Sequence, residues 1–287
     1  MGQCQHFFFR TLFPHGAGTR HVDRVVHSLS ILTMALAKDT GFLLRKIPFS
    51  ETSFILKAFT REHGLVSLMA KGAKRPSSRY RGVLEPILHL QFLFPAFSRS
   101  EIRILGEVSL LKDFPGLRDN PVKQGLARVF AELLLRYPPS ESDAAQFHDL
   151  LLQAQETLEK SPPDRSGLQA QLTFFLLSYF NISGFQPQFK TCVRCGGVLS
   201  GGNIPFLIDQ GGPLCAGCNR DEASVYFLRE NIVRWLDAIQ TGGDTPELSR
   251  TDMWRAEEFL LRYLGRHAGG ERSLKSLSVW HALMEGD

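Results

Sequence analysis

The sequence predicts an α+β chain in which a small N-terminal β-barrel precedes an α-helical bundle with an inserted four-cysteine ribbon. Three observations support this fold class. Short strand-like runs fill residues 41–110, the hydrophobic period becomes helical after residue 116, and two Cys-x2-Cys pairs interrupt the helical part. With 287 residues, of which 43% are hydrophobic and 22% charged, the chain can bury one large core or two small ones.

The first 33 residues follow neither helical nor strand periodicity for long. A secretory signal could in principle lie in the apolar stretch 29–37, but that stretch is short, and reduced cysteines argue against export. Met34 opens a segment that leads directly into the patterned region. We therefore expect residues 1–33 to be a misplaced start or a disordered extension. No apolar run approaches the roughly 18 residues that a membrane-spanning helix needs.

Five short runs rich in β-branched or aromatic residues predict the strands of the barrel. Turn-forming residues at 48–51 and 61–64 separate the first three. The five predicted strands cover residues 41–47, 53–60, 64–70, 87–94 and 101–108. So many short strands in about seventy residues indicate a small closed barrel, which has no free sheet edge and often presents one face to nucleic acid.

Helical patterning begins after Pro115-Gly116. Asn120-Pro121 is a plausible cap and first turn for a helix that ends before Pro138-Pro139, and Ser140 or Ser142 is a candidate cap for the next. The apolar spacing places that second helix up to about residue 158 and a third over 165–180. After the cysteine pairs, helical patterning resumes at 231–239, 251–264 and 273–284. The apolar stripe of residues 174–180 is interpreted as core.

Two matched cysteine pairs, separated by nineteen residues, form a Cys4 set. The four ligands are Cys192, Cys195, Cys215 and Cys218. This spacing is typical of a structural Zn2+ site, whose closed thiolate shell leaves no open position for a substrate. A strand over 204–208 and a turn at 211–213 between the pairs fit a zinc ribbon. Lys190, Arg194 and Arg220 are near enough in sequence to offset a charge of about −2 on the metal centre.

Other interpretations of the cysteines remain open. The pairs could form redox-active or structural disulfides, although such motifs usually come singly after a strand in a βαβ unit. The set could also hold iron, or the thiols could be unrelated. Cys4 has no partner in the sequence. Reduced, metal-binding cysteines fit a cytoplasmic location.

A basic segment at residues 71–81 is the main candidate for binding. Eleven lysines and arginines stand against five acidic residues in 41–110, so the rest of the chain is slightly acidic. The segment is rich in glycine, proline and serine and contains no acid; its cations are Lys71, Lys74, Arg75, Arg79 and Arg81. Clustered cations neutralise phosphates, and we predict that Tyr80 offers a ring for an unpaired base. The alternative is a solvated loop that is basic for solubility.

No motif of an enzyme is found. The sequence lacks a phosphate-binding Gly-x4-Gly-Lys-Ser/Thr loop, a His-Glu-x-x-His pair, a His-x-Glu before the cysteines and a Gly-x-Ser-x-Gly elbow. His63 lies in a predicted turn and His89 in a predicted strand, so we interpret both as surface or packed histidines. The sequence therefore indicates a binding protein.

Taken together, these segments resemble the family of the bacterial DNA repair protein RecO. The resemblance covers the chain from about Met34 to the last helix, although residues 92–101 depart from a glycine-containing turn common in that family. The segments that carry it are 50–64, 71–75, 78–80, 84–86, 106–114 and 177–187.

The resemblance implies an OB-fold barrel at 34–115 and a helical domain at 116–287, with a zinc module at about 188–220. It implies binding of single- and double-stranded DNA, strand annealing, and loading of RecA with RecR onto gaps coated by single-strand-binding protein. It also implies that the chain holds the acidic, hydrophobic C-terminal tail of that protein, in the cytoplasm at the nucleoid and without a membrane partner. The cations of 71–81 match the family's basic loop, and the four cysteines match its metal set.

Two other functions compete with this one. A zinc-stabilised adaptor could dock proteins through a helical groove, with the basic segment incidental. A zinc-dependent enzyme acting on nucleic acid is the weaker alternative, because a Cys4 shell is closed.

Overall fold

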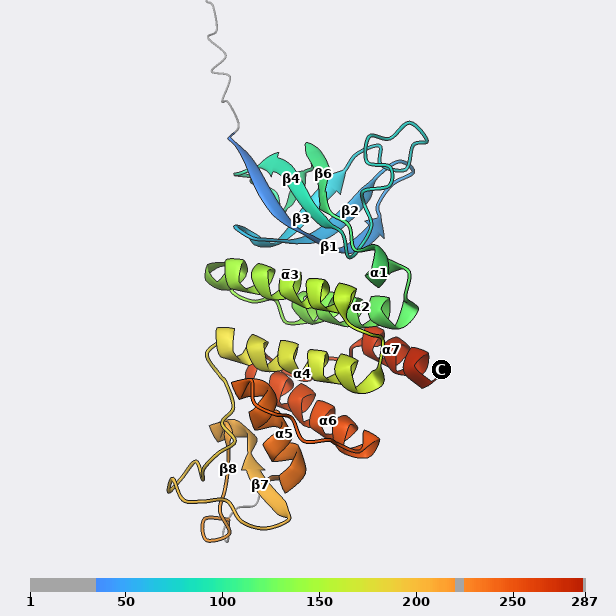
Figure 1. The fold of residues 1–287 in the computed structure, drawn as a ribbon. Coiled ribbons are helices and arrows are strands. Elements are labelled where there is room, and N and C mark those ends of the chain that lie inside the picture. Colours follow the sequence, from blue (N-terminus) through green and yellow to red (C-terminus); the bar gives the residue numbers. More distant parts are fainter. Residues whose placement is uncertain (1–34, 220–224, 286–287) are drawn as a thin grey trace, which may run out of the picture. The chain divides into compact units, whose positions relative to one another are not determined.

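In the computed structural model, residues 35–219 and 225–285 are described, so the expectation for residues 1–33 lies outside them. The first part of this described chain is a six-stranded sheet (Figure 1). Its order is β5-β3-β2-β1-β4-β6, and all neighbours are antiparallel except β3 and β5. The strands are β1 (Leu36–Pro48), β2 (Phe54–Thr60), β3 (Gly64–Ala70), β4 (His89–Pro95), β5 (Ile102–Ile104) and β6 (Glu107–Lys112).

Alternating side chains of these strands fill the interior of the curled sheet. In β3, for example, every second residue is buried, as expected for a half-buried strand. Leu56, Leu68 and Phe92 are fully buried together in this interior cluster. The predicted β-rich N-terminal part of the fold class is therefore confirmed. Strands β2, β3 and β4 lie close to their predicted bounds, whereas β1 begins at Leu36, before the predicted residue 41.

The predicted closed barrel is wrong in one respect, because the fifth strand is split. Strand β5 pairs with β3, strand β6 pairs with β4, and the two strands do not pair with each other. Between them, Leu105 N donates to Met69 O at 3.0 Å and Gly106 N donates to Leu93 O at 2.7 Å. A Cβ on Gly106 would lie 2.9 Å from that same Leu93 oxygen, so the crossing requires glycine. The open ends of the sheet are thus joined by the chain itself.

The predicted helical part is also confirmed. The α-helices are α1 (Pro115–Arg118), α2 (Pro121–Arg136), α3 (Ala144–Lys160), α4 (Arg165–Ile182), α5 (Glu230–Thr241), α6 (Arg250–His267) and α7 (Lys275–Glu285). Asn120 caps α2 as predicted, since its Oδ1 accepts from Lys123 N at 3.0 Å. The serine cap expected for α3 is wrong. A 3-10 turn (Glu141–Asp143) precedes that helix, and the Ser140 hydroxyl donates to the Asp143 carboxylate at 2.6 Å.

Helices α2 and α3 lie against the sheet, and α4 packs on their other side (Figure 1). Phe42 and Phe59 extend from the sheet into the core that is shared with the helices. The apolar stripe of α4 is core, as predicted, except that Phe174 is exposed. One face of the sheet therefore joins the helices in a common hydrophobic core, which is distinct from the cluster inside the barrel.

Two histidines meet at this contact between sheet and helices. The Nε2 atoms of His89 (β4) and His148 (α3) lie 3.1 Å apart, and the His89 ring stacks on Phe42 with centroids 4.8 Å apart. Arg61 pairs with Asp149 at 3.0 Å, and Asp149 also accepts from His148. His89 is thus a packed residue, as the sequence indicated. His63 is packed too: its Nδ1 lies 2.7 Å from a carboxylate oxygen of the buried Asp39.

Titration of His89 is expected to lower the stability of the folded chain in mild acid. Burial, the neighbouring His148 and Lys112 lower the pKa of His89 from 6.5 to about 4. Because the folded pKa lies below the unfolded one, the folded state favours the neutral ring. The stability that the neutral His89 ring contributes is fully present above about pH 6.5 and is lost as the pH falls towards about 4. Because the His89 ring is only half-buried and water screens its interactions, the stability loss over that window is on the order of 1–2 kcal/mol.

The measurement is urea denaturation of the parent chain and of His89→Gln at about pH 7 and about pH 5. The parent is expected to lose more stability than the variant, whose side chain does not titrate. The other charged groups at this contact are Lys112 paired with Glu156, and Arg61 paired with Asp149. These partners lower the pKa values of Glu156 and Asp149, which favours the charged forms of both carboxylates. Equal acid losses in the two proteins would contradict the assignment.

Candidate metal centre and nucleic-acid interface

The cysteine pairs lie in a small ribbon between α4 and α5. It contains β7 (Asn203–Leu207), a 3-10 turn (Ile208–Gln210), β8 (Gly212–Pro213) and β9 (Tyr226–Arg229). Strand β7 and the turn at Gly211, whose φ is +66°, were predicted from the sequence. Strand β9, which pairs with β7, was not, because the four-residue run Tyr226–Arg229 is too short to show a period.

The structure brings all four predicted ligands together. The sulfur atoms of Cys192, Cys195, Cys215 and Cys218 lie within 4.8 Å of one another, and no other such cluster of three or more ligands is found in the described residues. A tetrahedron with metal–sulfur bonds of about 2.3 Å has sulfur–sulfur edges of about 3.8 Å. The Cys195–Cys215 separation is 3.7 Å, close to this edge and far from a disulfide bond of about 2.05 Å. The donor set therefore fits one tetrahedral ion.

Backbone amides favour the charged form of at least one ligand. Burial opposes ionisation of Cys192, but hydrogen bonds from the amides of Cys215, Cys195 and Arg194 lower its pKa to about 6. The Arg194 guanidinium donates from Nη1 to Cys218 O at 3.2 Å, which places one of the predicted compensating charges beside the cluster. Lys190 is exposed nearby in the chain, and Arg220 lies outside the described residues.

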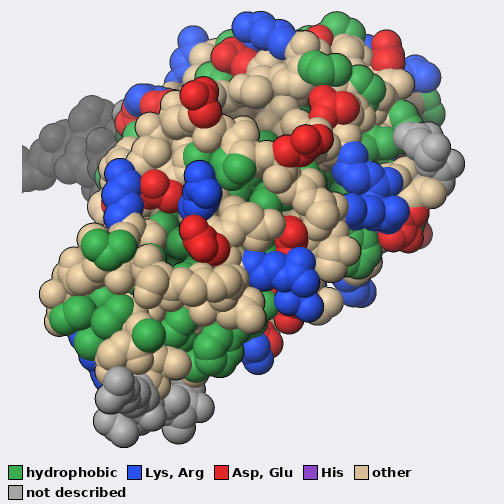
Figure 2. Space-filling model, turned by 60° about the horizontal axis from the view of Figure 1, so that its bottom comes forward, with side chains coloured by type: hydrophobic (Ala, Val, Ile, Leu, Met, Phe, Trp, Pro, Cys, Tyr) green, Lys and Arg blue, Asp and Glu red, His purple; other side chains and the backbone are tan. Residues whose placement is uncertain are grey.

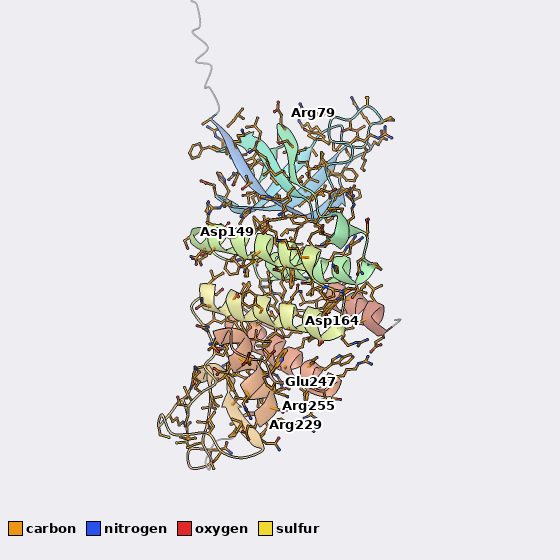
Figure 3. All side chains as sticks on the ribbon, in the orientation of Figure 1. Arg79, Asp149, Asp164, Arg229, Glu247 and Arg255 are labelled. Atoms are coloured by element: carbon orange, nitrogen blue, oxygen red, sulfur yellow. The ribbon has the colours of Figure 1, made fainter. Side chains whose placement is uncertain are left out.

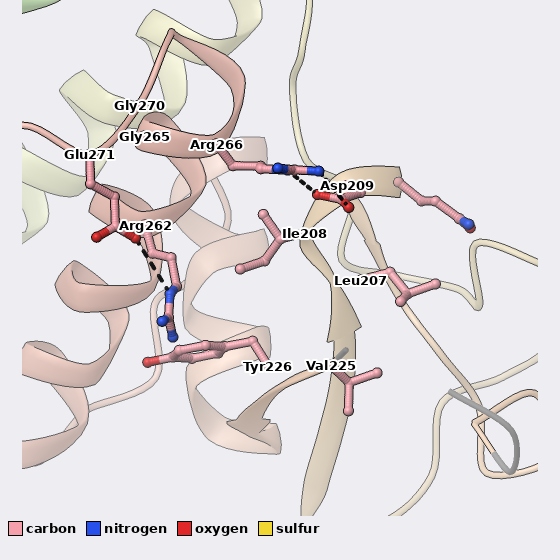
Figure 4. A pocket seen from close by; sticks show the side chains of 11 residues that line it. Leu207, Ile208, Asp209, Val225, Tyr226, Arg262, Gly265, Arg266, Gly270 and Glu271 are labelled. Carbon is pink, nitrogen blue, oxygen red and sulfur yellow. Dashed lines mark hydrogen bonds and ion pairs between the residues drawn. The ribbon is translucent and has the colours of Figure 1, made fainter. Parts of the chain in front are cut away.

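The ribbon is attached to α6 across a hollow of about 670 Å³ (Figure 4). Arg266 forms an ion pair with Asp209, with Nη2 and Oδ2 3.0 Å apart. The ring of His267 lies with Nε2 2.8 Å from Ile208 O. The Tyr263 hydroxyl, which donates to Phe185 O at 2.8 Å, fills the space beside Gly211. A structural change in the ribbon can therefore be transmitted to the helical bundle through these contacts with α6.

The predicted basic segment connects β3 to β4 as a loop of successive turns at one end of the barrel. Its five cations are exposed, and Figure 3 shows Arg79 on the barrel, on the side away from α4 and α6. The side chains of Lys71 and Arg75 have no ion pair or hydrogen bond within the described residues. Arg81 makes only a long contact from Nη1 to Pro76 O, at 3.4 Å. Three of the five cations are thus available to an external partner.

The two remaining cations are engaged by other residues: Lys74 by the β1–β2 hairpin and Arg79 by its neighbour Tyr80. Lys74 Nζ donates to Ser50 O at 2.5 Å and lies over the Phe54 ring, 5.1 Å from its centroid. Arg79 lies 5.0 Å from the Tyr80 ring centroid and donates from Nη2 to the Tyr80 hydroxyl at 3.0 Å. The sequence could not separate these roles, because all five cations occupy the same polar segment.

The stacking role predicted for Tyr80 is contradicted. Only 4% of this residue is exposed, since its ring belongs to the interior cluster of the barrel. Its hydroxyl donates to Leu105 O at 2.9 Å, beside the chain crossing at Gly106. Tyr80 therefore anchors the basic loop to the barrel and offers no free face to a base.

Charge on another part of the surface is mixed. Figure 2 shows one face of the molecule, in which lysines and arginines are interspersed with aspartates and glutamates. Local pairs such as Arg250–Glu285 and Arg262–Glu271 illustrate this arrangement. The loop at 71–81, with no acid among its eleven residues, differs from that face in its charge pattern.

A second basic feature is a groove of about 550 Å³ between the sheet and helices α2 and α7. Aliphatic side chains line it, including Ile87, which at φ +84° is the only non-glycine residue with positive φ in the described chain. The Oε1 atom of Gln155, which also lines the groove, is buried and has no hydrogen-bond partner. One carboxylate, Glu132, which pairs with Arg136 at 3.4 Å, lines the groove together with five cations: Arg45, Lys57, Arg128, Arg136 and Lys275. These come from four separate elements, so no linear motif could have revealed the groove.

No helix in residues 35–219 or 225–285 is both long and apolar enough to cross a membrane.

Comparison with known proteins gives consistent matches along the chain. Residues 34–114 match the family described as recombination protein O N terminal, and residues 118–278 match recombination protein O C terminal. A protein of Anaeromyxobacter dehalogenans named DNA repair protein RecO is 29% identical over 252 residues, covering 85% of this chain and 98% of the relative. Proteins of the same name from another Anaeromyxobacter species and from Rubrobacter xylanophilus are each 32% identical, over 83% and 66% of this chain and 94% and 73% of the relatives.

Proposed function

The chain belongs to the recombination protein O family of DNA repair proteins, and from this premise we propose that it is a recombination mediator. It binds single- and double-stranded DNA, anneals complementary strands and, with RecR, helps to load RecA onto gaps coated by single-strand-binding protein in the cytoplasm. Its action is binding and not covalent catalysis. The observation that carries the proposal is the exposed, acid-free basic loop at 71–81.

The geometry of this loop suits a phosphate backbone. Lys71, Arg75 and Arg81 are exposed, and Lys74 and Tyr80 fix the loop against the barrel. Cations on a pre-arranged loop neutralise phosphates and release counterions without losing much freedom on binding. Such contacts carry no sequence information, which suits a protein that must act on any gap. We assign the barrel, residues 34–115, as the DNA-binding domain.

We assign the four-cysteine cluster to a structural Zn2+. Cys192, Cys195, Cys215 and Cys218 would hold the ion in a closed tetrahedral shell. The ion would supply the cross-link that a ribbon with three short strands lacks. The helical domain, residues 116–287 with the zinc module at about 188–220, then presents surfaces to protein partners.

The groove between barrel and bundle supports the proposed contact with the tail of single-strand-binding protein. That tail is expected to be acidic and hydrophobic. A groove with an aliphatic lining and five cations against one carboxylate is complementary to such a peptide.

The test is annealing of complementary strands, bare or coated with the cognate single-strand-binding protein. The chain is expected to accelerate annealing of both, and coated strands should respond less when the coating protein lacks its C-terminal tail. A chain that accelerates neither reaction would refute the mediator function. The adaptor alternative predicts a complex with a protein partner that resists salt, together with no DNA binding at moderate salt.

Joint replacement of Arg128 and Lys275 by alanine tests the groove in the same assay. It is expected to impair annealing of coated strands and to leave annealing of bare strands unchanged. Equal effects on bare and coated strands would contradict the proposal that the tail binds in this groove.

A further inference from the structure

The hairpin between β1 and β2 presents an aromatic ring to solvent beside the basic loop. Phe49 follows the last residue of β1 and is 57% exposed. The Phe49 amide donates to Ser53 O at 3.1 Å, so Phe49 belongs to a hydrogen-bonded turn. Exposed large apolar side chains are common singly, so exposure alone assigns no function.

The surroundings of Phe49 distinguish it from other exposed apolar residues. Lys74 of the basic loop bonds this hairpin twice: its Nζ donates to Ser50 O at 2.5 Å, and its amide donates to Thr52 O at 3.0 Å. The ring of Phe54, at the start of β2, is contacted by the ammonium groups of Lys74 and Lys46, which lie 5.1 and 5.5 Å from its centroid. The hairpin and the basic loop are therefore fixed side by side.

The combination of fixed cations and an exposed ring is the chemistry of single-strand binding. Cations hold the sugar–phosphate backbone, and an aromatic face accepts an unpaired base whatever its identity. In OB-type barrels the loop between the first two strands is one of those that contact oligonucleotides. Few acidic residues belong to this hairpin and its neighbourhood. Glu85 is paired with Lys46 at 2.8 Å, which leaves Glu51 as the acid of the hairpin itself.

We propose that Phe49 is the base-stacking residue of this barrel, in the role that the buried Tyr80 cannot take. An unpaired base stacks on the Phe49 ring while Lys71 and Arg75 hold the neighbouring phosphates. The inference rests on the proposed DNA-binding function and deepens it. It also gives the chain a means to favour single strands, since the bases of a duplex are already stacked on one another.

The test compares Phe49→Ala and Phe49→Leu with the parent chain in binding to single-stranded and duplex DNA. Loss of one stacked base should weaken single-strand binding by about 5- to 150-fold in both variants. Duplex affinity and the slope of log K against log salt should stay unchanged, because no phosphate contact is removed. An oligonucleotide carrying 2-aminopurine should lose fluorescence on binding the parent and keep it on binding Phe49→Ala.

A matched control is Phe97→Ala. Phe97 is 83% exposed and follows β4, whose end pairs with the start of β1, so it lies at the opposite end of that strand from Phe49. Thermal denaturation checks that each variant folds. Single-strand affinity unchanged in Phe49→Ala, retained in Phe49→Leu, or equally weakened by Phe97→Ala would overturn the inference. In each of these outcomes a parent chain that binds DNA with a steep salt dependence leaves the proposed function standing. Absence of DNA binding by the parent chain would refute both.

Discussion

Replacement of Lys71, Arg75 and Arg81 by alanine should weaken binding to single-stranded DNA by about 100-fold at 0.1 M salt. Each phosphate contact to a single strand contributes about 0.7 to the slope of log K against log salt. Loss of three contacts should therefore lower the slope by about 2, and the affinities of variant and parent should converge near 1 M salt. The measurement is fluorescence anisotropy of a labelled oligonucleotide over a range of salt concentrations.

The choice of these three cations follows from their contacts. Lys71 and Arg75 make no side-chain bond within the described residues, and Arg81 makes only the 3.4 Å contact to Pro76 O, so truncation of these exposed cations should leave the barrel folded. Lys74 and Arg79 anchor the loop to Ser50 and Tyr80, and their truncation would mix lost charge with a displaced loop.

A matched control removes three exposed cations outside the barrel, at Lys160, Lys190 and Arg234. This control lowers the net charge of the chain by the same amount, and its salt slope should stay close to that of the parent. If both triple variants lose affinity equally, the effect comes from total charge and not from the loop. An unchanged affinity in the loop variant would refute the interface.

Most strands and helices could be predicted because their apolar residues repeat with a clear period. Strand β3 buries every second residue, and α2 buries one stripe, so local sequence and tertiary burial agree. The metal ligands were predictable for a different reason. Four identical donors in two tight turns encode their own geometry, whatever the rest of the fold does.

The features that escaped prediction depend on contacts distant in sequence. The sheet is not closed as a regular barrel because Leu105–Gly106 crosses between Met69 and Leu93. Within residues 101–108 the local sign of this crossing is Gly106, but a glycine inside a strand pattern does not say between which strands the chain passes. Tyr80 lies in a polar segment, yet its ring is buried in the interior of the barrel. By contrast, Phe49 looks like an ordinary turn residue in the sequence. Its proposed role depends on its hairpin being bonded to Lys74, which belongs to another loop.

Removal of the metal is expected to have the second large effect, and that effect should be on stability. Structural Zn2+ contributes about 10–16 kcal/mol of apparent binding free energy in small zinc domains. In this chain only the ribbon depends directly on the ion, so we expect the double variant Cys195→Ser, Cys218→Ser to lose roughly 3–5 kcal/mol of folding stability. For a chain of this size that loss lowers the Tm by about 5–10 °C.

The loss should spread along α6, since Arg266 and His267 attach that helix to the ribbon at Asp209 and Ile208. Hydrogen exchange should therefore increase in the ribbon and in α6 before it increases in the barrel. Because the basic loop is anchored to the barrel through Lys74 and Tyr80, DNA binding below the new Tm should persist. A variant that loses DNA binding and zinc together while its barrel stays protected would contradict this separation.

Metal analysis completes the test. Protein purified without added zinc should carry about one equivalent of Zn2+, and the serine variant should carry none. Cys4→Ser is the matched control, because it removes a thiol that belongs to neither pair, and it should keep both the metal and the Tm. Less than about half an equivalent of zinc, or iron in its place, would contradict the assignment. A ribbon protected equally with and without metal would show that its attachment to α6, and not the ion, holds it together.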